Sequence, residues 1–373
     1  MSKMKVHWRY TSSTRNTYAG LFAACEQEGF LMEPVSQPSL DVTCYSLNSL
    51  NVHTMRPEMA KADCTVIAGG PYATACWRQV LEYADYVIVG EGEYTLPSLL
   101  SCIEAGKPVC PPGVATTEGY VPANSNVLLD AYPPFSKMKG YVEISRGCPF
   151  SCTYCQTPRI LGHAMRHRSI ESIARYASRY RDARFVSPNA LAYGSDGRQP
   201  RLDKVKSLLS ALSNNVYFGT FPSEVRPEFI TEEALSLITW YCANSSIQFG
   251  AQSGSDTVLR TIGRGHTIGD VIRAVELTLD VGLIPIVDII VGFPFETDDD
   301  QHATAELVRW VTRFGKVHAH SFQPLPDTPL ARLKPRSITR ELSHLLGSLA
   351  QRGKLSGSWR SLEIGFSHSS SND

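Results

Sequence analysis

The chain has 373 residues, and its 36 lysines and arginines balance its 36 aspartates and glutamates. This length suggests two domains and allows each a sizeable core, while the zero net charge argues against a broad basic face that grips nucleic acid. No apolar run is long enough to span a membrane, and the N-terminus lacks the basic, apolar and small-residue pattern of a secretory signal. We therefore expect a cytoplasmic protein.

Strand-like and helical patterns alternate in the first third of the chain. Strands are predicted at residues 5–10, 42–47, 64–68 and 86–89, with helices at 14–28 and 74–82. This alternation is typical of a parallel sheet with helices on both faces, and it predicts a doubly wound α/β domain over residues 1–105. Glycine-containing turns follow two of the strands, where open sheets of this type bind their ligands.

Residues 106–139 are rich in proline, which predicts a linker or strap that contributes no core element. A second alternating series follows. Its predicted strands are 141–146, 184–187, 216–219, 246–250, 284–291 and 317–322, and its predicted helices are 169–181, 201–213, 231–242, 269–281 and 298–313. Six such units predict a partial (β/α)6 barrel over residues 140–330, with its active site on the loops after the strands. Residues 331–373 are expected to form a C-terminal helix and a mobile tail.

Three of the ten cysteines, Cys148, Cys152 and Cys155, are crowded into one short segment. Their C-x3-C-x2-C spacing suits three ligands of a 4Fe–4S cluster whose fourth iron stays open. The alternative is zinc, with His163 or His167 as the fourth ligand, although no second pair of closely spaced cysteines is present. The other seven are expected to be small apolar core residues: Cys25, Cys44, Cys64, Cys76, Cys102, Cys110 and Cys242.

The cysteine motif, with Tyr154 just before its last cysteine, resembles the signature of the radical S-adenosylmethionine (SAM) enzymes. The resemblance implies that SAM is cleaved at the open iron to a 5′-deoxyadenosyl radical, with electrons from a donor such as ferredoxin or flavodoxin. It also implies that Tyr154 lies near the adenine, Ser187 and Asn189 near the methionine amino group, and Glu224 on the ribose. Gln252 is a further cofactor-binding candidate. Taken alone, a glutamate such as Glu224 is more often a solvated surface carboxylate, and Gln252 could equally cap or bridge loops.

The N-terminal segment is similar to the cobalamin-binding domain that accompanies many radical SAM enzymes. The resemblance places cobalamin beside Ser46, Asn48, Gly69, Gly70, Pro71, Tyr72, Gly90, Glu91 and Gly92. The family's Asp-x-His-x-x-Gly loop is missing, so cobalamin is expected in a base-off form without a protein histidine ligand, and Tyr72 or a neighbour is the candidate beneath the cobalt. The alternative is a domain of this fold that has lost cobalamin and only supports the barrel.

Together, the two resemblances imply a cobalamin-dependent radical SAM C-methyltransferase of the class B type. Such an enzyme methylates an unactivated sp3 carbon through a 5′-deoxyadenosyl radical and methylcobalamin. The chain looks most like the methanogen members that C-methylate a glutamine of methyl-coenzyme M reductase, which implies a protein or peptide substrate and a role in post-translational modification linked to methanogenesis.

Other functions stay open at this level. They are a cobalamin-assisted radical cyclase or oxidoreductase acting on a small molecule, and a cobalamin or iron–sulfur sensor without turnover. A methylthiotransferase is disfavoured because a second cysteine triplet is absent, and nucleic acid is an unlikely partner for a neutral chain.

Overall fold

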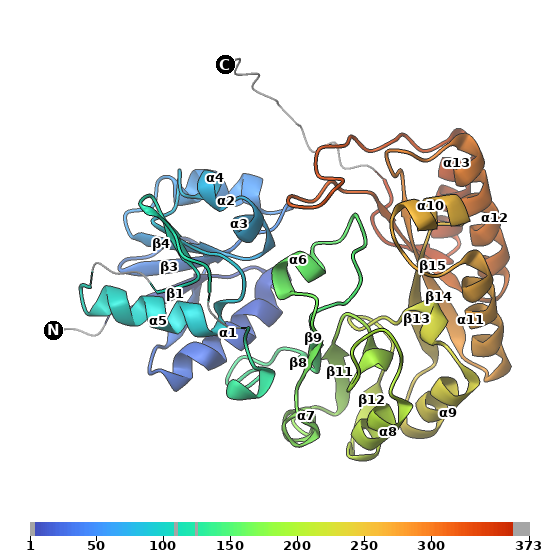
Figure 1. Cartoon of the computed structure of the whole chain (residues 1–373), viewed down its shortest axis with the longest axis horizontal. Coiled ribbons are helices and arrows are strands. Elements are labelled where there is room, and N and C mark those ends of the chain that lie inside the picture. The colour runs from blue at the N-terminus through green and yellow to red at the C-terminus, as the bar shows by residue number, and fades with distance from the viewer. Residues whose placement is uncertain (1–3, 108–110, 124–125, 361–373) are drawn as a thin grey trace.

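The protein is described from a computed structural model, which places residues 4–107, 111–123 and 126–360. Two α/β domains stand side by side, the N-terminal one built on an open sheet and the second on a curved array of strands (Figure 1). This arrangement confirms the predicted fold class. The boundaries drawn from the sequence at residues 105, 139 and 330 stay predictions.

The N-terminal sheet has the strand order β2-β1-β3-β4-β5-β6-β7. Its strands are β1 (Val6–Arg9), β2 (Met32–Val35), β3 (Val42–Ser46), β4 (Thr65–Gly69), β5 (Tyr86–Ile88), β6 (Val114–Thr116) and β7 (Gly119–Tyr120). The first five run parallel, whereas β6 and β7 are antiparallel to their neighbours. The order reverses between β1 and β3, and a doubly wound sheet opens a crevice for a ligand at such a point.

Helices cover both faces of this sheet (Figure 1). Their bounds are α1 (Arg15–Gln27), α2 (Val52–Met59), α3 (Pro71–Ala75), α4 (Trp77–Val80) and α5 (Gly92–Glu104). One core cluster forms where α1 and α5 pack on the strands, and another forms beneath α2, α3 and α4. The single helix predicted at 74–82 is in fact two short helices that meet at Cys76 and begin earlier, at Pro71.

Two parts of this domain differ from the sequence prediction. Strand β2 was missed because it is an edge strand with exposed Glu33 and Pro34 in its middle, and proline is tolerated only at such edges. The expectation that residues 106–139 contribute no core element is wrong. Strands β6 and β7 lie in this segment and extend the sheet, and the side chains of Val114 and Phe135 are buried.

The second domain is a partial barrel of six parallel strands with one added strand. They form two sheets, β12-β11-β8 and β13-β14-β15-β16. Their bounds are β8 (Val142–Glu143), β11 (Asp182–Val186), β12 (Asn215–Tyr217), β13 (Ser246–Gln252), β14 (Ile284–Val291), β15 (Lys316–Ser321) and β16 (Leu355–Ser356). The amide of Gln248 donates to the carbonyl of Gly219 at 2.8 Å and joins the two sheets. The predicted strand 284–291 matches β14 at both ends, because its long apolar run contains Asp288 as its one charged residue.

The predicted first barrel strand divides in two. Strand β8 pairs in parallel with β11, whereas β9 (Ser145–Arg146) leaves the barrel and pairs antiparallel with β10 (Arg166–His167). The outer helices are α7 (Ile170–Ala177), α8 (Leu202–Ser210), α9 (Glu232–Tyr241), α10 (Asp256–Thr261), α11 (Ile268–Asp280), α12 (Asp298–Phe314) and α13 (Arg340–Gln351). A large apolar cluster fills the space between these helices and the strands.

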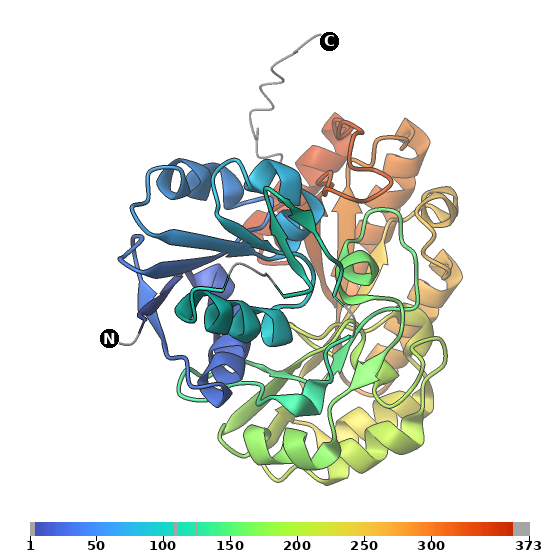
Figure 2. The ribbon, with the colours of Figure 1, turned by 60° about the vertical axis from the view of Figure 1, so that its left-hand side comes forward.

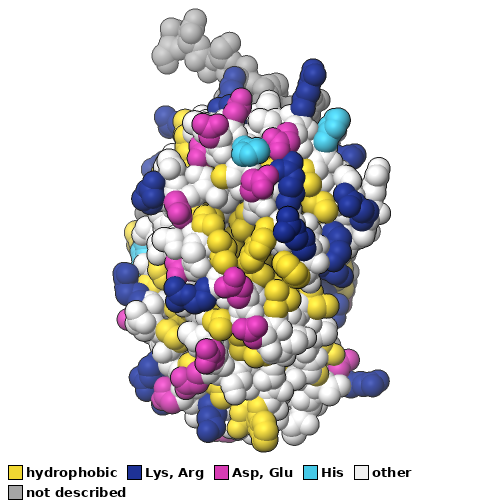
Figure 3. All heavy atoms as spheres, turned by 90° about the vertical axis from the view of Figure 1, so that its right-hand side faces the viewer, with side chains coloured by type: hydrophobic (Ala, Val, Ile, Leu, Met, Phe, Trp, Pro, Cys, Tyr) yellow, Lys and Arg dark blue, Asp and Glu magenta, His cyan; other side chains and the backbone are white. Residues whose placement is uncertain are grey.

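The outer face of the barrel, at the right of Figure 1, carries α11, α12 and α13. Basic and acidic side chains intermingle on it around a group of hydrophobic ones (Figure 3). Among the described residues, no helix combines the length and the apolar character that crossing a membrane requires. The predicted mobile tail falls largely at 361–373, outside the described residues.

Candidate radical SAM site and a second cavity

The three motif cysteines lie on the loop between β9 and β10, which we call the cysteine loop (residues 147–165). This loop and its short helix α6 (Thr157–Leu161) lie between the two domains (Figure 2). The loop begins at Gly147, whose φ of +90° favours glycine. The amide of Cys148 then donates to the carbonyl of Gly162 at 3.1 Å. The loop is therefore closed on itself by its own backbone.

Polar groups surround the cysteine sulfurs. The Nη1 atom of Arg264 lies 3.9 Å from Sγ of Cys152, and the amide of Thr157 donates to Sγ of Cys155 at 3.4 Å. Burial, partly offset by a backbone hydrogen bond, raises the pKa of the Cys148 thiol. A guanidinium and an amide that point at sulfur suit thiolates that are held by a metal centre.

The positions of the three cysteine sulfurs do not suit a single zinc ion. A single zinc ion would draw its sulfur ligands to about 3.8 Å from one another, given Zn–S bonds of about 2.3 Å in a tetrahedron. Within the described part of the chain, one group of three ligand atoms lies close enough for a metal ion, with all atoms within 4.8 Å of one another: His302, Glu306 and Glu341. The three cysteine sulfurs do not meet this distance. His167, a proposed fourth zinc ligand, is bonded through Nε2 to the carbonyl of Ser195 at 2.7 Å. The residues fit a 4Fe–4S cluster.

A cavity of about 160 Å³ opens beside this loop, at the carboxyl ends of the barrel strands. Cys148 lines it together with three predicted cofactor-binding residues, Asn189, Glu224 and Gln252. Both side-chain polar atoms of Asn189 are buried and have no protein partner. Because buried amides are almost always hydrogen-bonded, this pair of atoms indicates a polar ligand in the cavity. The donor and acceptor groups present fit the methionine and ribose parts of SAM.

Two other predicted residues lie near this cavity without lining it. The hydroxyl of Ser187 donates to the carbonyl of Asn189 at 3.0 Å and accepts from the amide of the same residue, so it shapes the turn. Tyr154 packs edge-on against Phe293, with ring centroids 5.8 Å apart. Gly292 leaves no room for a side chain, because a Cβ there would meet the carbonyl oxygen of Arg336. The amide of Gly292 donates a hydrogen bond to the Glu296 carboxylate.

Asp288 is a cavity residue that the sequence analysis missed. It lies in the middle of β14, lines the cavity, and accepts a hydrogen bond from Nε2 of Gln248 at 2.7 Å. Burial, and secondly the nearby Glu224 carboxylate, raise the pKa of Asp288 well above its ordinary value. Its position as the one charge in a long apolar run was the available signal.

His318 and His320, on the neighbouring strand β15, were also missed. His318 is the register partner of Asp288, and the two imidazoles face each other with Nε2 atoms 2.8 Å apart. Their Nδ1 atoms bond to the hydroxyls of Ser356 and Ser358. Burial lowers the pKa of both rings. The alternating His-Ala-His pattern in a predicted strand was the signal for a shared face.

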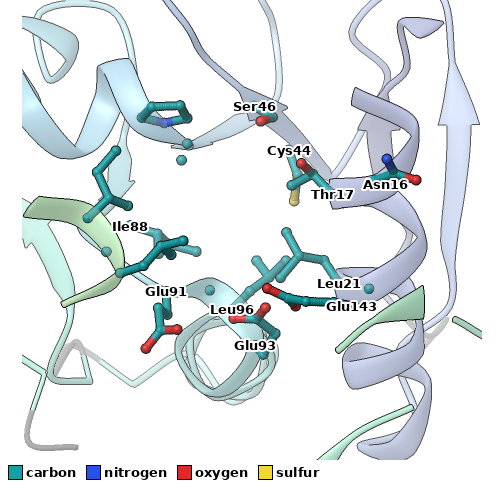
Figure 4. A pocket seen from close by; sticks show the side chains of 18 of the residues that line it. Asn16, Thr17, Leu21, Cys44, Ser46, Ile88, Glu91, Glu93, Leu96 and Glu143 are labelled. Atoms are coloured by element: carbon teal, nitrogen blue, oxygen red, sulfur yellow. The ribbon is translucent and has the colours of Figure 1, made fainter. Parts of the chain in front are cut away.

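A second cavity, of about 300 Å³, lies at the switch point of the N-terminal sheet (Figure 4). Apolar side chains such as Trp8, Ile67 and Ile88 form much of its wall. The predicted cofactor-binding residues that line it are Ser46, Gly69, Gly70, Pro71, Gly90, Glu91 and Gly92. Residues of α1, the cysteine loop and the barrel complete the lining, so both domains contribute to it.

Asn48 and Tyr72 were predicted beside a cofactor, but the structure gives them other contacts. The side-chain oxygen of Asn48 accepts from the amide of Asn51 at 3.0 Å, at the start of α2. Tyr72 packs on the core beneath α3, where burial raises its pKa. Gly70 has a φ of +92°, and a Cβ there would meet the carbonyl of Leu47 at 2.8 Å. The glycine is thus required by the approach of the protein's own chain.

Glu296 is a buried carboxyl beside the SAM cavity loops and gives a test of the structure by pH. Burial raises its pKa to about 7, from an ordinary value of 4.5. Because the folded state holds this proton more tightly than the unfolded state, the neutral carboxyl stabilises the fold. This contribution is complete below the unfolded-state pKa and is lost as pH rises through about 7. We expect Glu296→Gln to leave the free energy of unfolding nearly unchanged near pH 5 and to raise it at pH 8.5 by at most about 3 kcal/mol.

Denaturant unfolding at the two pH values measures this difference. Glu276→Gln, which changes an exposed residue of α11, is the matched control and should show no pH-dependent gain. An equal effect of Glu296→Gln at both pH values would contradict the buried, proton-binding role of this carboxyl.

Residues 142–308 match the family model of the Radical SAM superfamily, a segment that contains the cysteine motif and most of the barrel. Among curated proteins, the threonylcarbamoyladenosine tRNA methylthiotransferase MtaB of Thermotoga maritima is 28% identical over 240 residues. The match covers 59% of this chain and 54% of that protein, so the chain spans about half the length of this relative.

Two solved structures share both domains. The radical SAM methyltransferase TsrM from Kitasatospora setae, with cobalamin and a 4Fe–4S cluster bound, superposes with a TM-score of 0.69 at 16% identity and covers 89% of this chain and 74% of that chain. The cobalamin-dependent SAM radical enzyme OxsB, with aqua-cobalamin and SAM bound, gives a TM-score of 0.61 at 16% identity and covers 94% of this chain and 55% of that chain. At this identity the likeness concerns the fold.

A radical SAM domain implies a 4Fe–4S cluster and SAM as cofactors, in agreement with the cysteine loop and the cavity beside it. Residues 142–308 are therefore a segment similar to the Radical SAM superfamily, and a doubly wound α/β domain precedes it in this chain.

Proposed function

We propose that this protein is a radical SAM enzyme, and that it is a cobalamin-dependent methyltransferase that acts on a carbon atom of its substrate. The observation that carries the proposal is the position of the two cavities. Arg146 lines the N-terminal cavity and Cys148, two residues later, lines the SAM cavity. A substrate held where the domains meet would have access to both, and positioning of this kind supplies a large part of enzymatic rate enhancement.

The N-terminal cavity suits a large, flat cofactor. It opens at the carboxyl edge of the sheet between β1 and β3, much of its wall is apolar, and Gly20 and Gly90 carry no side chain to block it. When bound, cobalamin supplies a transferable methyl group. The described residues that line the cavity include no histidine, so the proposed cofactor is base-off without a protein imidazole.

The protein's own residues would orient the substrate and shield it from water. The segment 323–329 approaches the cysteine loop, because Nε2 of Gln156 donates to the carbonyl of Pro326 at 2.7 Å. Asp288 on β14 and Glu224 in the loop after β12 supply carboxyl groups, and His318 and His320 on β15, next to β14, supply imidazoles. The polar barrel wall favours a substrate with hydrogen-bonding groups next to the reacting carbon.

The finer description of the substrate rests on the sequence resemblance. On this basis the methylated atom is an unactivated sp3 carbon of a protein or peptide side chain, and the specific candidate is a glutamine of methyl-coenzyme M reductase. A cytoplasmic location and a one-electron donor such as ferredoxin or flavodoxin belong to the same proposal. A cyclase, an oxidoreductase or a sensor would use the same cofactor sites and would differ in product.

Methylthio transfer is a second candidate, because curated relatives such as MtaB bear that name. It would need further sulfur ligands near the barrel. The described N-terminal cysteines lie on different elements. Cys25 is buried in α1, Cys64 immediately precedes β4, and Cys44 lines the cavity between the domains. Cys76 lies between α3 and α4, and Cys102 lies in α5. This scattered arrangement favours methyl transfer; Cys110 lies outside the described residues.

The test uses the full chain with its cluster restored anaerobically, together with cobalamin, a reductant, candidate peptides and methyl-labelled SAM. Methyl transfer predicts label in the corrinoid and in the product, accompanied by 5′-deoxyadenosine. A product that gains sulfur would favour methylthio transfer. Cofactor binding without nucleoside release, or turnover without label in the corrinoid, would refute the proposed function.

A further inference from the structure

The cysteine loop is held at its base by a pair of arginines. Arg146 on β9 and Arg166 on β10 are register partners in the antiparallel pair that closes the loop. Their side chains are 9% and 12% exposed, so both charges are nearly buried. Every motif cysteine lies between these two residues in the sequence, and a shift of either arginine would therefore displace the loop.

Both arginines bind the same carboxylate of the other domain, that of Glu91. Nη1 of Arg146 lies 2.7 Å from Oε1 of Glu91, and Nη1 of Arg166 lies 2.9 Å from each of the two carboxylate oxygens. Glu91 is the residue that precedes the first turn of α5, so its position is fixed by the N-terminal domain. We call these three residues the Glu91 bridge.

Further buried groups complete the bridge. Arg146 also binds Glu93 at 2.7 Å and Glu143 at 2.6 Å, and Arg166 donates to the carbonyl of Leu161 at the end of α6. Burial alone would lower the pKa of Arg146, but the Glu93 and Glu143 carboxylates raise it above its ordinary value. Removal of one partner from such a network leaves a buried charge uncompensated, which is strongly unfavourable.

All of these charged residues except Arg166 form part of the N-terminal cavity wall. Glu91, Glu93, Glu143 and Arg146 line it, and the carboxylates of the three glutamates gather at one side of the cavity beside Leu96 (Figure 4). Leu161 of α6 also lines it. A molecule in the cavity would cover the bridge and exclude water from it, and ion pairs strengthen when water is excluded.

We propose that the Glu91 bridge couples occupancy of the N-terminal cavity to the order of the cysteine loop. Glu91 is then a positioning residue and not a cofactor ligand. This inference rests on the proposed function, because it takes cobalamin as the occupant. The coupling is reciprocal: cobalamin steadies the loop, and a filled cluster site raises the affinity for cobalamin by the same factor.

The test is hydrogen–deuterium exchange of residues 147–165 in the full chain with its cluster in place, with and without cobalamin. In the native protein we expect cobalamin to slow loop exchange by about 5- to 150-fold, the usual range of such coupling. Glu91→Gln should abolish most of this protection. Glu58→Gln is the matched control, because it removes an Arg–carboxylate pair, with Arg9, that lies wholly within the N-terminal domain.

Arg166→Lys provides a second variant that keeps the positive charge but loses the planar fork that binds Glu91 through Nη1 and Leu161 through Nη2, and it should reduce the protection in part. Cobalamin binding to each protein is measured separately by its absorbance after dialysis. Equal loop protection by cobalamin in the native protein and in Glu91→Gln would overturn the coupling and leave the proposed function standing. Failure of the native protein to bind cobalamin would overturn both.

Discussion

Replacement of any one of Cys148, Cys152 and Cys155 by alanine is expected to abolish reductive cleavage of SAM. Each residue supplies one of three thiolates to one face of a cluster, so no neighbouring ligand can substitute for it. The loss should exceed the about 10- to 100-fold that follows removal of an outer partner of a metal site. Release of 5′-deoxyadenosine under anaerobic conditions, together with iron content per chain, measures the effect.

Cys242→Ala is the control, because this cysteine packs against the barrel core at the end of α9 and does not belong to the cysteine loop. It should retain iron and nucleoside release. Full activity in any of the three motif variants would refute the cluster assignment. Iron retention without nucleoside release would locate the defect in SAM binding.

Gly147→Ala is expected to disrupt the cysteine loop more than any other single methyl group added there. The backbone at this position has a φ of +90°, and a Cβ atom would collide with the carbonyl oxygen of Ala164. The unfavourable backbone conformation alone costs about 1–3 kcal/mol, and relief of the collision requires the loop to move. We expect a lower melting temperature and a fall in the iron bound after reconstitution.

Gly162→Ala separates the two causes. Gly162 lies in the same loop with a φ of +80°, but a Cβ there meets nothing within 4 Å. This variant should show the backbone cost and keep its iron. Equal iron loss in both variants would indicate that backbone strain, and not the collision with Ala164, controls the loop.

The sequence was most informative where the physical signal is local. The cysteine motif occupies eight consecutive residues, so its spacing alone predicts the ligand set. Strand β14 was predicted at both ends because a long apolar run between turn residues has few alternatives. Strand β2 contains a proline and lies at one edge of the sheet. Strands β6 and β7 at the other side have three and two residues. Segments this short carry little periodicity.

The candidate site was predictable residue by residue but not as an assembly. Asn189 and Glu224 follow β11 and β12, Gln252 ends β13, and the three residues line one cavity. Asp288 and His318 meet only because β14 and β15 pair in one register. A shift of one residue would turn these side chains to the opposite face, and no local pattern sets that register.

By itself, the sequence determined the cofactor chemistry of this protein: three thiolates at a fixed spacing after a strand, followed by six alternating units that build the surrounding barrel. Only the tertiary structure decided how the two halves meet. Glu91 lies 55 residues from Arg146 and 75 from Arg166, and Glu93 lies 53 from Arg146. Contacts over such separations depend on domain packing, because local backbone preferences act over only a few residues.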